Sequence, residues 1–326
     1  MSRTHPLDLP EIRSRIASSL GHKELASCAR VCQDWNDSFT PPLYNSIELS
    51  EYGPSMESFE RNKQLIRHLL VQKSAYETLS STSAQDNVVS RIMANSNLTT
   101  LNLNYKAIGD NETQALSEAM KINSTLTTLN LRVNSISPNG SQALSEALKI
   151  NSTLITLNLG GNSTGPIGTK ALTEALRTNS TLTTLDLGAN SIGDSGAQAL
   201  SEALKTNSTL TTLYLDDNDI GSDGALALFE ALKTNSTLTI LDLWWNSIGP
   251  DGAQALSEAL KTNATLTTLS LDANKIRPSG AKALSEALMT NSTLTTLNLE
   301  NNSIGDNGAQ ALSEALRTNS TLTNWT

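Results

Sequence analysis

The chain has 326 residues, of which 38% are hydrophobic and 4% aromatic, and its formal net charge is −9. This acidic balance argues against nucleic acid and anionic membranes as partners, because both require a basic face. No apolar run reaches the roughly 18–20 residues of a membrane span, and the first ten residues contain no apolar signal-peptide core. We therefore expect a cytoplasmic or nuclear protein.

Residues 1–46 predict a small module of two or three short helices. Ile12, Ile16 and Leu20 recur every four residues, as on one face of a helix, and Gly21 ends that helix. A second helix with its own apolar face follows. One interpretation of these residues is an N-terminal cap that covers the open end of the array that follows.

The order of residues in this module also resembles an F-box. That family's pattern begins Leu-Pro-x-Glu-Ile, continues with Val-Cys-x-x-Trp and ends with Pro-x-Leu-Trp. This chain lacks one residue after Pro10, has Arg13 where an apolar residue is usual, and has Tyr44 in place of the last Trp. The resemblance implies docking on a Skp-type adaptor through an apolar edge. The implied adaptor-binding residues are Leu9, Pro10, Ile12, Ile16, Val31, Cys32 and Trp35.

Residues 47–97 form a connecting segment between this module and the rest of the chain. Residues 47–49 predict a strand, and the polar residues 74–87 predict a loop. An irregular first repeat is indicated by Ile66, Leu69 and Val71, and a last helix before the regular array by Val89, Ile92 and Met93.

From residue 98 to residue 326 the sequence repeats with a period of 28. The array consists of eight full units and a partial ninth. The leucine that opens each unit stands at Leu98, Leu126, Leu154, Leu182, Leu210, Leu238, Leu266, Leu294 and Leu322.

Each unit combines a short strand with a helix, as the unit that begins at Leu182 illustrates. Its first half alternates as Leu-x-Leu, so both leucines of a strand point inward. Its second half places Ala and Leu at helical spacing. We expect Asp194 to cap this helix and Asn207 to end it in the left-handed conformation. The expected buried face is Ala197, Leu200, Ala203 and Leu204, and the expected solvent face is Gln198, Ser201, Glu202 and Lys205.

One unit cannot bury its own leucines, so the units are expected to stack into a parallel sheet covered by helices. Because strands are spaced about 4.8 Å apart and helices are about 10 Å wide, the array must curve with its strands on the concave side. The predicted fold is an α/β leucine-rich-repeat horseshoe, and the unit resembles the ribonuclease-inhibitor-type repeat. That resemblance implies a buried asparagine ladder at Asn134, Asn162, Asn190, Asn218, Asn246, Asn274 and Asn302.

Two units depart from this pattern. In the third, Thr164 replaces the isoleucine of the turn and Ile167 follows three residues later, which predicts a locally shifted loop. In the ninth, Trp325 takes the place of a strand leucine, and no polar capping repeat follows. We expect this last unit to fray or to self-associate.

The repeats offer no recognisable catalytic or cofactor site. Residues 98–326 contain neither His nor Cys, so a Ser–His or Cys–His nucleophile cannot be built there. Gly193 and Gly196 lack the Lys-Ser/Thr ending of a phosphate loop. The repeated Asn-Ser-Thr sequons predict helix ends and turns rather than glycosylation. We expect a protein that is not an enzyme and that holds no metal or cofactor.

The strand positions that face solvent vary from unit to unit, while the framework does not. An aromatic cluster and several carboxylates fall on neighbouring strands, and residues 98–326 carry −8 of the net charge. An exposed aromatic pair with an acidic rim suits a protein target, especially a basic one, although drift between duplicated units remains an alternative. The predicted partner-binding residues are Tyr214, Asp216, Asp217, Asp242, Trp244, Trp245 and Asp272.

An F-box joined to leucine-rich repeats resembles the substrate-recognition subunits of SCF-type cullin–RING ubiquitin ligases, and most of all the fungal members of that group. The resemblance implies a Skp-type adaptor, a cullin and a protein target as partners. The alternative is a free-standing regulator, because the repeat also resembles the ribonuclease inhibitor and Ran GTPase-activating proteins.

Overall fold

The computed structural model describes residues 46–49, 66–71, 92–93 and 96–326. The predicted helical module with its seven adaptor-binding residues, the predicted loop at 74–87 and Val89 therefore lie outside the described residues. The chain divides into two compact units, residues 1–103 and residues 104–326. They are called unit 1 and unit 2 below, and each is described by itself.

The described part of unit 1 contains three parallel strands, β1 (Ser46–Leu49), β2 (His68–Val71) and β3 (Thr100–Asn102). Strand β2 pairs with β1 on one side and with β3 on the other. Ile66 and Leu69 are buried, and Ile92 and Met93 are helical and buried. The predicted strand at 47–49 is thus confirmed.

Unit 2, all of which is described, is a regular alternation of strands and helices. Each strand pairs in parallel with the next, in a register offset of 28 residues. The strands are β4 (Thr128–Asn130), β5 (Thr156–Asn158), β6 (Thr184–Asp186), β7 (Thr212–Tyr214), β8 (Ile240–Asp242), β9 (Thr268–Ser270), β10 (Thr296–Asn298) and β11 (Asn324–Trp325). The helices are α7 (Asp110–Ile122), α8 (Pro138–Leu148), α9 (Gly165–Leu176), α10 (Gly193–Leu204), α11 (Ser222–Leu232), α12 (Gly249–Leu260), α13 (Arg277–Leu288) and α14 (Gly305–Thr318).

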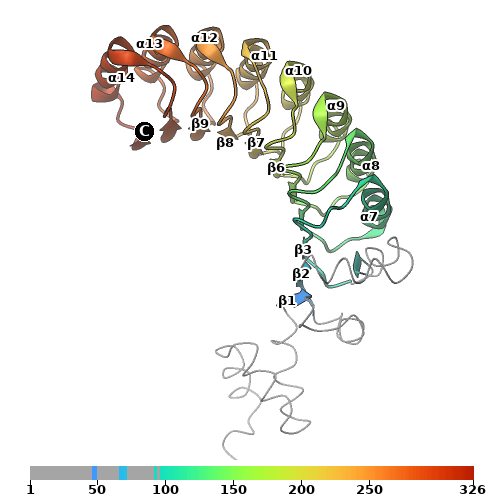
Figure 1. Ribbon diagram of the computed structural model, residues 1–326. Helices are drawn as coiled ribbons and strands as arrows, with labels where there is room; N and C mark the ends of the chain where they lie inside the picture. The colour runs from blue at the N-terminus through green and yellow to red at the C-terminus, as the bar shows by residue number, and fades with distance from the viewer. Residues whose placement is uncertain (1–45, 50–65, 72–91, 94–95) are drawn as a thin grey trace, which may run out of the picture. The chain divides into compact units, whose positions relative to one another are not determined.

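Unit 2 curves into an arc, with its strands on the inner, concave side and its helices on the outer, convex side (Figure 1). The core lies between these layers. Leu185 and Leu187 of one unit are buried, and so is the predicted face of α10, with Ala197 and Leu200 at 0% exposure. The predicted horseshoe architecture is confirmed for this unit.

The asparagine ladder implied by the repeat type is present. Asn190 donates from Nδ2 to the carbonyl oxygens of Leu159 (3.0 Å) and Leu187 (3.1 Å). Its Oδ1 accepts the Thr164 N–H of the preceding unit at 3.1 Å. Each amide therefore ties two units together and satisfies buried backbone groups that would otherwise be costly.

A second asparagine ladder lies where the sequence predicted a helix-ending residue. Asn207 is not left-handed. Its Nδ2 donates to the Leu176 carbonyl oxygen of the preceding unit at 2.7 Å, and its Oδ1 accepts the N–H groups of Thr209 (3.1 Å) and Leu210 (2.8 Å). The left-handed prediction was wrong because this buried amide replaces the capping geometry. The equivalent residues are Asn151, Asn179, Asn207, Asn235, Asn263, Asn291 and Asn319.

The prediction that Asp194 caps its own helix was also wrong. The cap position of α10 is Ile192, whose own side chain makes no capping hydrogen bond. Asp194 Oδ1 instead accepts the N–H groups of Gly221 (2.7 Å), the cap residue of α11, and Gly224 (3.0 Å) in the first turn of that helix. The carboxylate thus satisfies orphan donors of the next helix, where the helix dipole also favours a negative charge.

Two smaller expectations were also wrong. Ser201 is buried rather than solvent-facing, and its hydroxyl donates to the Gln198 carbonyl oxygen at 2.7 Å. The loop at Thr164 is not shifted, because α9 begins 28 residues before α10. Thr164 is buried in the isoleucine position, where its hydroxyl accepts a hydrogen bond from Ser141 Oγ at 3.2 Å, and Ile167 is exposed.

Candidate interaction surface

The concave face of unit 2 is lined by the strand residues that alternate with the buried leucines. Asp186, Tyr214 and Asp242 are directly opposite one another on β6, β7 and β8. Since neighbouring strands are about 4.8 Å apart, these three side chains form one continuous row across the sheet. A second row lies just beyond the ends of these strands, two residues after the first. It consists of Gly188, Asp216 and Trp244, and Asp272 continues it after β9.

Trp244 and Trp245 project from the end of β8, with 43% and 58% of their surface exposed. Their rings meet edge to face, with centroids 5.9 Å apart and planes at 64°. Trp245 has a φ of +54°, the left-handed conformation that the equivalent Gly161 also adopts. Trp244 is exposed, as the strand alternation predicts, and neither ring enters the core.

The side chain at the start of each of these turns anchors the local backbone. Asp242 Oδ1 accepts the Trp244 N–H at 2.9 Å, and Asp186 Oδ1 accepts the Gly188 N–H at 2.9 Å. Asn158 makes the same bond to the N–H of Gly160 at 2.9 Å. A side-chain oxygen at this position therefore stabilises the turn, and asparagine provides it as well as aspartate does.

Two glycines let the carboxylates lie against the preceding strand. A Cβ atom at Gly188 would sit 2.4 Å from Asp216 Oδ1, and one at Gly160 would sit 3.0 Å from Asp186 Oδ1. The first distance is impossible for real atoms and the second is tight. The position of Asp216 on the concave face thus depends on the absence of a side chain at Gly188.

The acidic row carries little compensating positive charge. Arg132 Nη1 lies 3.8 Å from Asp186 Oδ2 at one end of the row. Burial raises the pKa of Asp186 despite its backbone hydrogen bond and Arg132. Burial also raises the pKa of Asp216, and the charges of Asp242 and Asp186 add to that shift. Burial, with Glu300 and Asp242, raises the pKa of Asp272.

The structure brings most of the predicted partner-binding residues onto one surface. Tyr214 lies between Asp186 and Asp242 in the row. Asp217 is exposed at the edge of the face, where its N–H donates to the Trp244 carbonyl oxygen at 2.8 Å. The prediction missed Asp186, which is nearly buried. The available signal was an aspartate at the strand position that holds Asn158 in the preceding unit.

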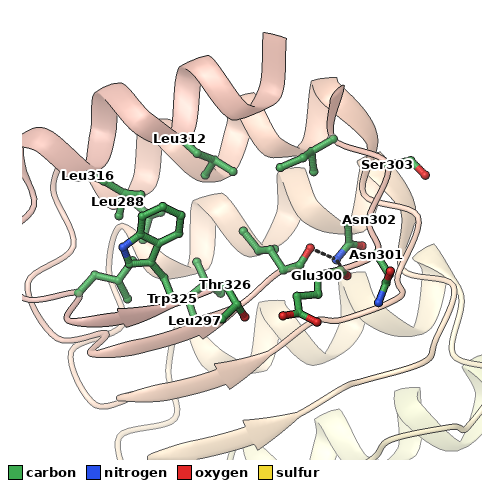
Figure 2. A pocket seen from close by; sticks show the side chains of 13 residues that line it. Leu288, Leu297, Glu300, Asn301, Asn302, Ser303, Leu312, Leu316, Trp325 and Thr326 are labelled. Atoms are coloured by element: carbon green, nitrogen blue, oxygen red, sulfur yellow. Dashed lines mark hydrogen bonds between the residues drawn. The ribbon is translucent and has the colours of Figure 1, made fainter. Parts of the chain in front are cut away.

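A separate apolar cavity of about 280 Å³ lies at the C-terminal end of the array. Leucines from α14, β10 and the last turn line it, together with Trp325 (Figure 2). Trp325 is opposite Leu297 in the sheet, in the place of a strand leucine, and it is 57% exposed. This cavity lies within the last unit, between α14 and the strands β10 and β11, and it is distinct from the tryptophan pair that follows β8.

Within the described residues, no cluster of three or more His, Cys, Asp or Glu side chains has the arrangement of a metal site. In the same part of the chain, every helix is too short or too polar to cross a membrane.

Comparison with protein families matches two kinds of repeat. The family described as TMOD/LMOD Leucine-rich domain matches residues 155–247, and the Leucine Rich repeat family matches residues 123–145, 262–285 and 290–313. The chain contains a leucine-rich-repeat domain. The curved sheet, the helical outer layer and the two asparagine ladders of unit 2 belong to this domain.

Solved structures with a similar course of the chain include two protein-binding assemblies. "Leiomodin-1 Actin-Binding Site 2 (ABS2)" is 28% identical over 46% of this chain and 88% of its own, with a TM-score of 0.39. The yeast Rad7 and Elc1 complex matches 96% of this chain and 85% of its own at 16% identity, with a TM-score of 0.49. No similar protein was found among curated sequences.

Proposed function

We propose that this chain is a non-catalytic receptor. The concave face of its leucine-rich-repeat domain holds a protein target, and residues 1–46 dock on a Skp-type adaptor. The chain would then act in the cytoplasm or nucleus as the substrate-recognition subunit of an SCF-type cullin–RING ubiquitin ligase.

The exposed tryptophan pair is the observation that carries the target-binding half of this proposal. Neither the strand nor the turn needs these rings, because the equivalent residues in the preceding unit are Asp216 and Asp217 and those in the following unit are Asp272 and Ala273. Tryptophan is enriched among the residues that dominate protein interfaces. Two adjacent exposed rings at the middle of a concave sheet therefore supply an anchor for a protein surface.

The adaptor half of the proposal rests on the order of residues in the first module. Leu9-Pro10, Val31-Cys32 and Trp35 follow the F-box pattern. On this proposal the chain performs no chemistry. It raises the local concentration of the target next to the ubiquitin-conjugating machinery, and proximity supplies the rate. A leucine-rich-repeat fold alone would not support this function, since one fold serves many purposes.

Capture of purified Skp-type adaptor by the full chain tests the proposal. We expect the wild-type chain to retain the adaptor and the Leu9→Ala/Pro10→Ala variant to lose it. A Ser18→Ala/Ser19→Ala variant, which changes the same module outside the F-box pattern, should retain it. If the wild-type chain does not bind the adaptor, the ligase proposal fails and the free-standing regulator becomes the better account.

A further inference from the structure

The negative charges on the concave face are not required by the fold. At the start of the strand-end turn, Asn130 and Asn158 accept the same backbone hydrogen bond that Asp186 and Asp242 accept, each at 2.9 Å. An amide oxygen therefore satisfies the turn without a charge. The fold would form equally well with asparagine in the row on β6 and β8.

These charges also weaken the folded state. Asp186 is only 9% exposed, and burial of an ionised carboxylate is unfavourable unless it is compensated. Burial is the largest cause of the raised pKa of Asp216, and the nearby charges of Asp242 and Asp186 raise that pKa further. Among the described residues, the ion pair between Arg132 and Asp186 is the one ion pair that these carboxylates make. A row of carboxylates that the fold does not need, and that opposes folding, indicates a use outside the fold.

One carboxylate oxygen of Asp272, on the same face, lacks a hydrogen-bond donor among the described residues. Asp272 Oδ2 accepts a hydrogen bond from Asn298 Nδ2. Asp272 Oδ1 is shielded from solvent and accepts no hydrogen bond from the described residues. This acceptor is a further polar group on the concave face that the fold leaves uncompensated, which is unfavourable for a group shielded from solvent.

The tryptophan pair lies within this acidic surface. Trp244 follows Asp242 by two residues, and the Trp245 N–H donates to the Asp272 carbonyl oxygen at 2.9 Å. On the other side of the pair, the Asp217 N–H donates to the Trp244 carbonyl oxygen at 2.8 Å. Aromatic faces attract cations, and an Arg guanidinium both stacks on a ring and forms a forked pair with a carboxylate.

We propose that the target held on this face presents a basic segment. Its Arg or Lys side chains lie over the carboxylates of Asp186, Asp216 and Asp242, and one of them, or an adjacent apolar side chain, packs on Trp244 and Trp245. This inference rests on the proposed function, since it specifies the chemistry of the target on the same surface. An acidic segment would be repelled by the row, and a neutral one would leave the carboxylates without partners.

Three synthetic dodecapeptides, which repeat Gly-Arg-Leu-Arg, Gly-Ser-Leu-Ser or Gly-Glu-Leu-Glu, serve as probes in calorimetric titrations of the full chain. We expect the arginine peptide alone to bind, more weakly as salt is raised. Asp216→Asn/Asp242→Asn keeps the shape of both side chains and should reduce affinity by roughly tenfold or more. Trp244→Ala/Trp245→Ala should reduce it by a similar factor. The matched control is Asp223→Asn/Asp251→Asn on the convex helices, which makes the same change in net charge and should leave affinity within about twofold.

Three results would overturn the proposal. If the arginine peptide does not bind, the row does not recognise cations. If the control variant weakens binding as much as Asp216→Asn/Asp242→Asn does, the attraction belongs to the whole acidic chain. If the serine peptide binds in a way that needs the tryptophans but not the carboxylates, the face binds a neutral target. Binding of the serine peptide would still be compatible with the proposed receptor function. The adaptor-capture experiment tests that function separately.

Discussion

Replacing Asn235 with alanine removes one rung of the second asparagine ladder, and the structure sets the size of the effect. Asn235 Nδ2 donates to the Leu204 carbonyl oxygen at 2.8 Å, and its Oδ1 accepts the N–H groups of Thr237 (3.1 Å) and Leu238 (2.8 Å). A weaker bond runs to the Asn207 carbonyl oxygen at 3.4 Å. The residue is 6% exposed, so water cannot easily replace these bonds.

Each buried hydrogen bond contributes about 1 kcal/mol net, and each buried group left unsatisfied costs about 1–3 kcal/mol. Three good bonds are lost in Asn235→Ala, so the free energy of unfolding should fall by about 3–5 kcal/mol. Urea unfolding followed by circular dichroism measures this as a lower midpoint. Gln254→Ala, which removes an exposed amide from α12, should change the free energy of unfolding by less than about 0.5 kcal/mol. A loss below about 1 kcal/mol for Asn235→Ala would mean that the ladder does not hold the units together, and the reasoning would be wrong.

Three further predictions concern the concave face and the helix caps. Asp216→Asn should raise the free energy of unfolding at neutral pH, because the ionised group is destabilised in the folded state. That gain should shrink as pH falls through the raised pKa of Asp216 and vanish below the unfolded value of roughly 4; a gain independent of pH in urea titrations would refute the electrostatic cause. Gly188→Ala should lower the free energy of unfolding by less than about 1 kcal/mol, because its Cβ displaces only the end of the flexible Asp216 side chain, and Asp216→Gly should remove that cost in a double-mutant cycle. Asp194→Ala should lower the free energy of unfolding by about 1 kcal/mol and should speed hydrogen exchange of the Gly221 and Gly224 amides, which it bonds. Faster exchange at the start of α10 instead would contradict this assignment.

The sequence was sufficient to predict the parts of the fold that repeat. The period of 28 residues, the alternation of Leu185 and Leu187, and the helical spacing of Ala197 and Leu200 each follow from a single unit read by itself. Stacking of the units and the direction of curvature then follow from the widths of strands and helices.

Three of the four failed expectations share one physical cause. Asn207, Asp194 and Thr164 each bond to a neighbouring unit, so their roles depend on the register between units as well as on the local pattern. Asparagine near a helix end is common as a left-handed residue, and aspartate near a helix start is common as a cap. Local propensities therefore favoured the wrong partner at both places.

The candidate surface also has features that the sequence could predict and features that it could not. Alternation along β8 was enough to predict that Trp244 faces solvent. The contact between the Asp216 carboxylate and Gly188 could not be predicted, because the direction in which a side chain turns toward a neighbouring strand depends on three-dimensional packing. The same holds for the burial of Asp186, which places a charge where the sequence shows only one more polar strand residue.

Hydroxyl-radical footprinting of the full chain with the Gly-Arg-Leu-Arg dodecapeptide tests the central claim most directly. Trp325 is an internal control, because it is 57% exposed, much like Trp244 and Trp245 at 43% and 58%, but lies at the C-terminal end of the array. If the concave face is the binding surface, saturating peptide should suppress oxidation of Trp244 and Trp245 and leave Trp325 unchanged. Equal suppression of all three tryptophans, or oxidation of the pair unaffected by bound peptide, would contradict the claim.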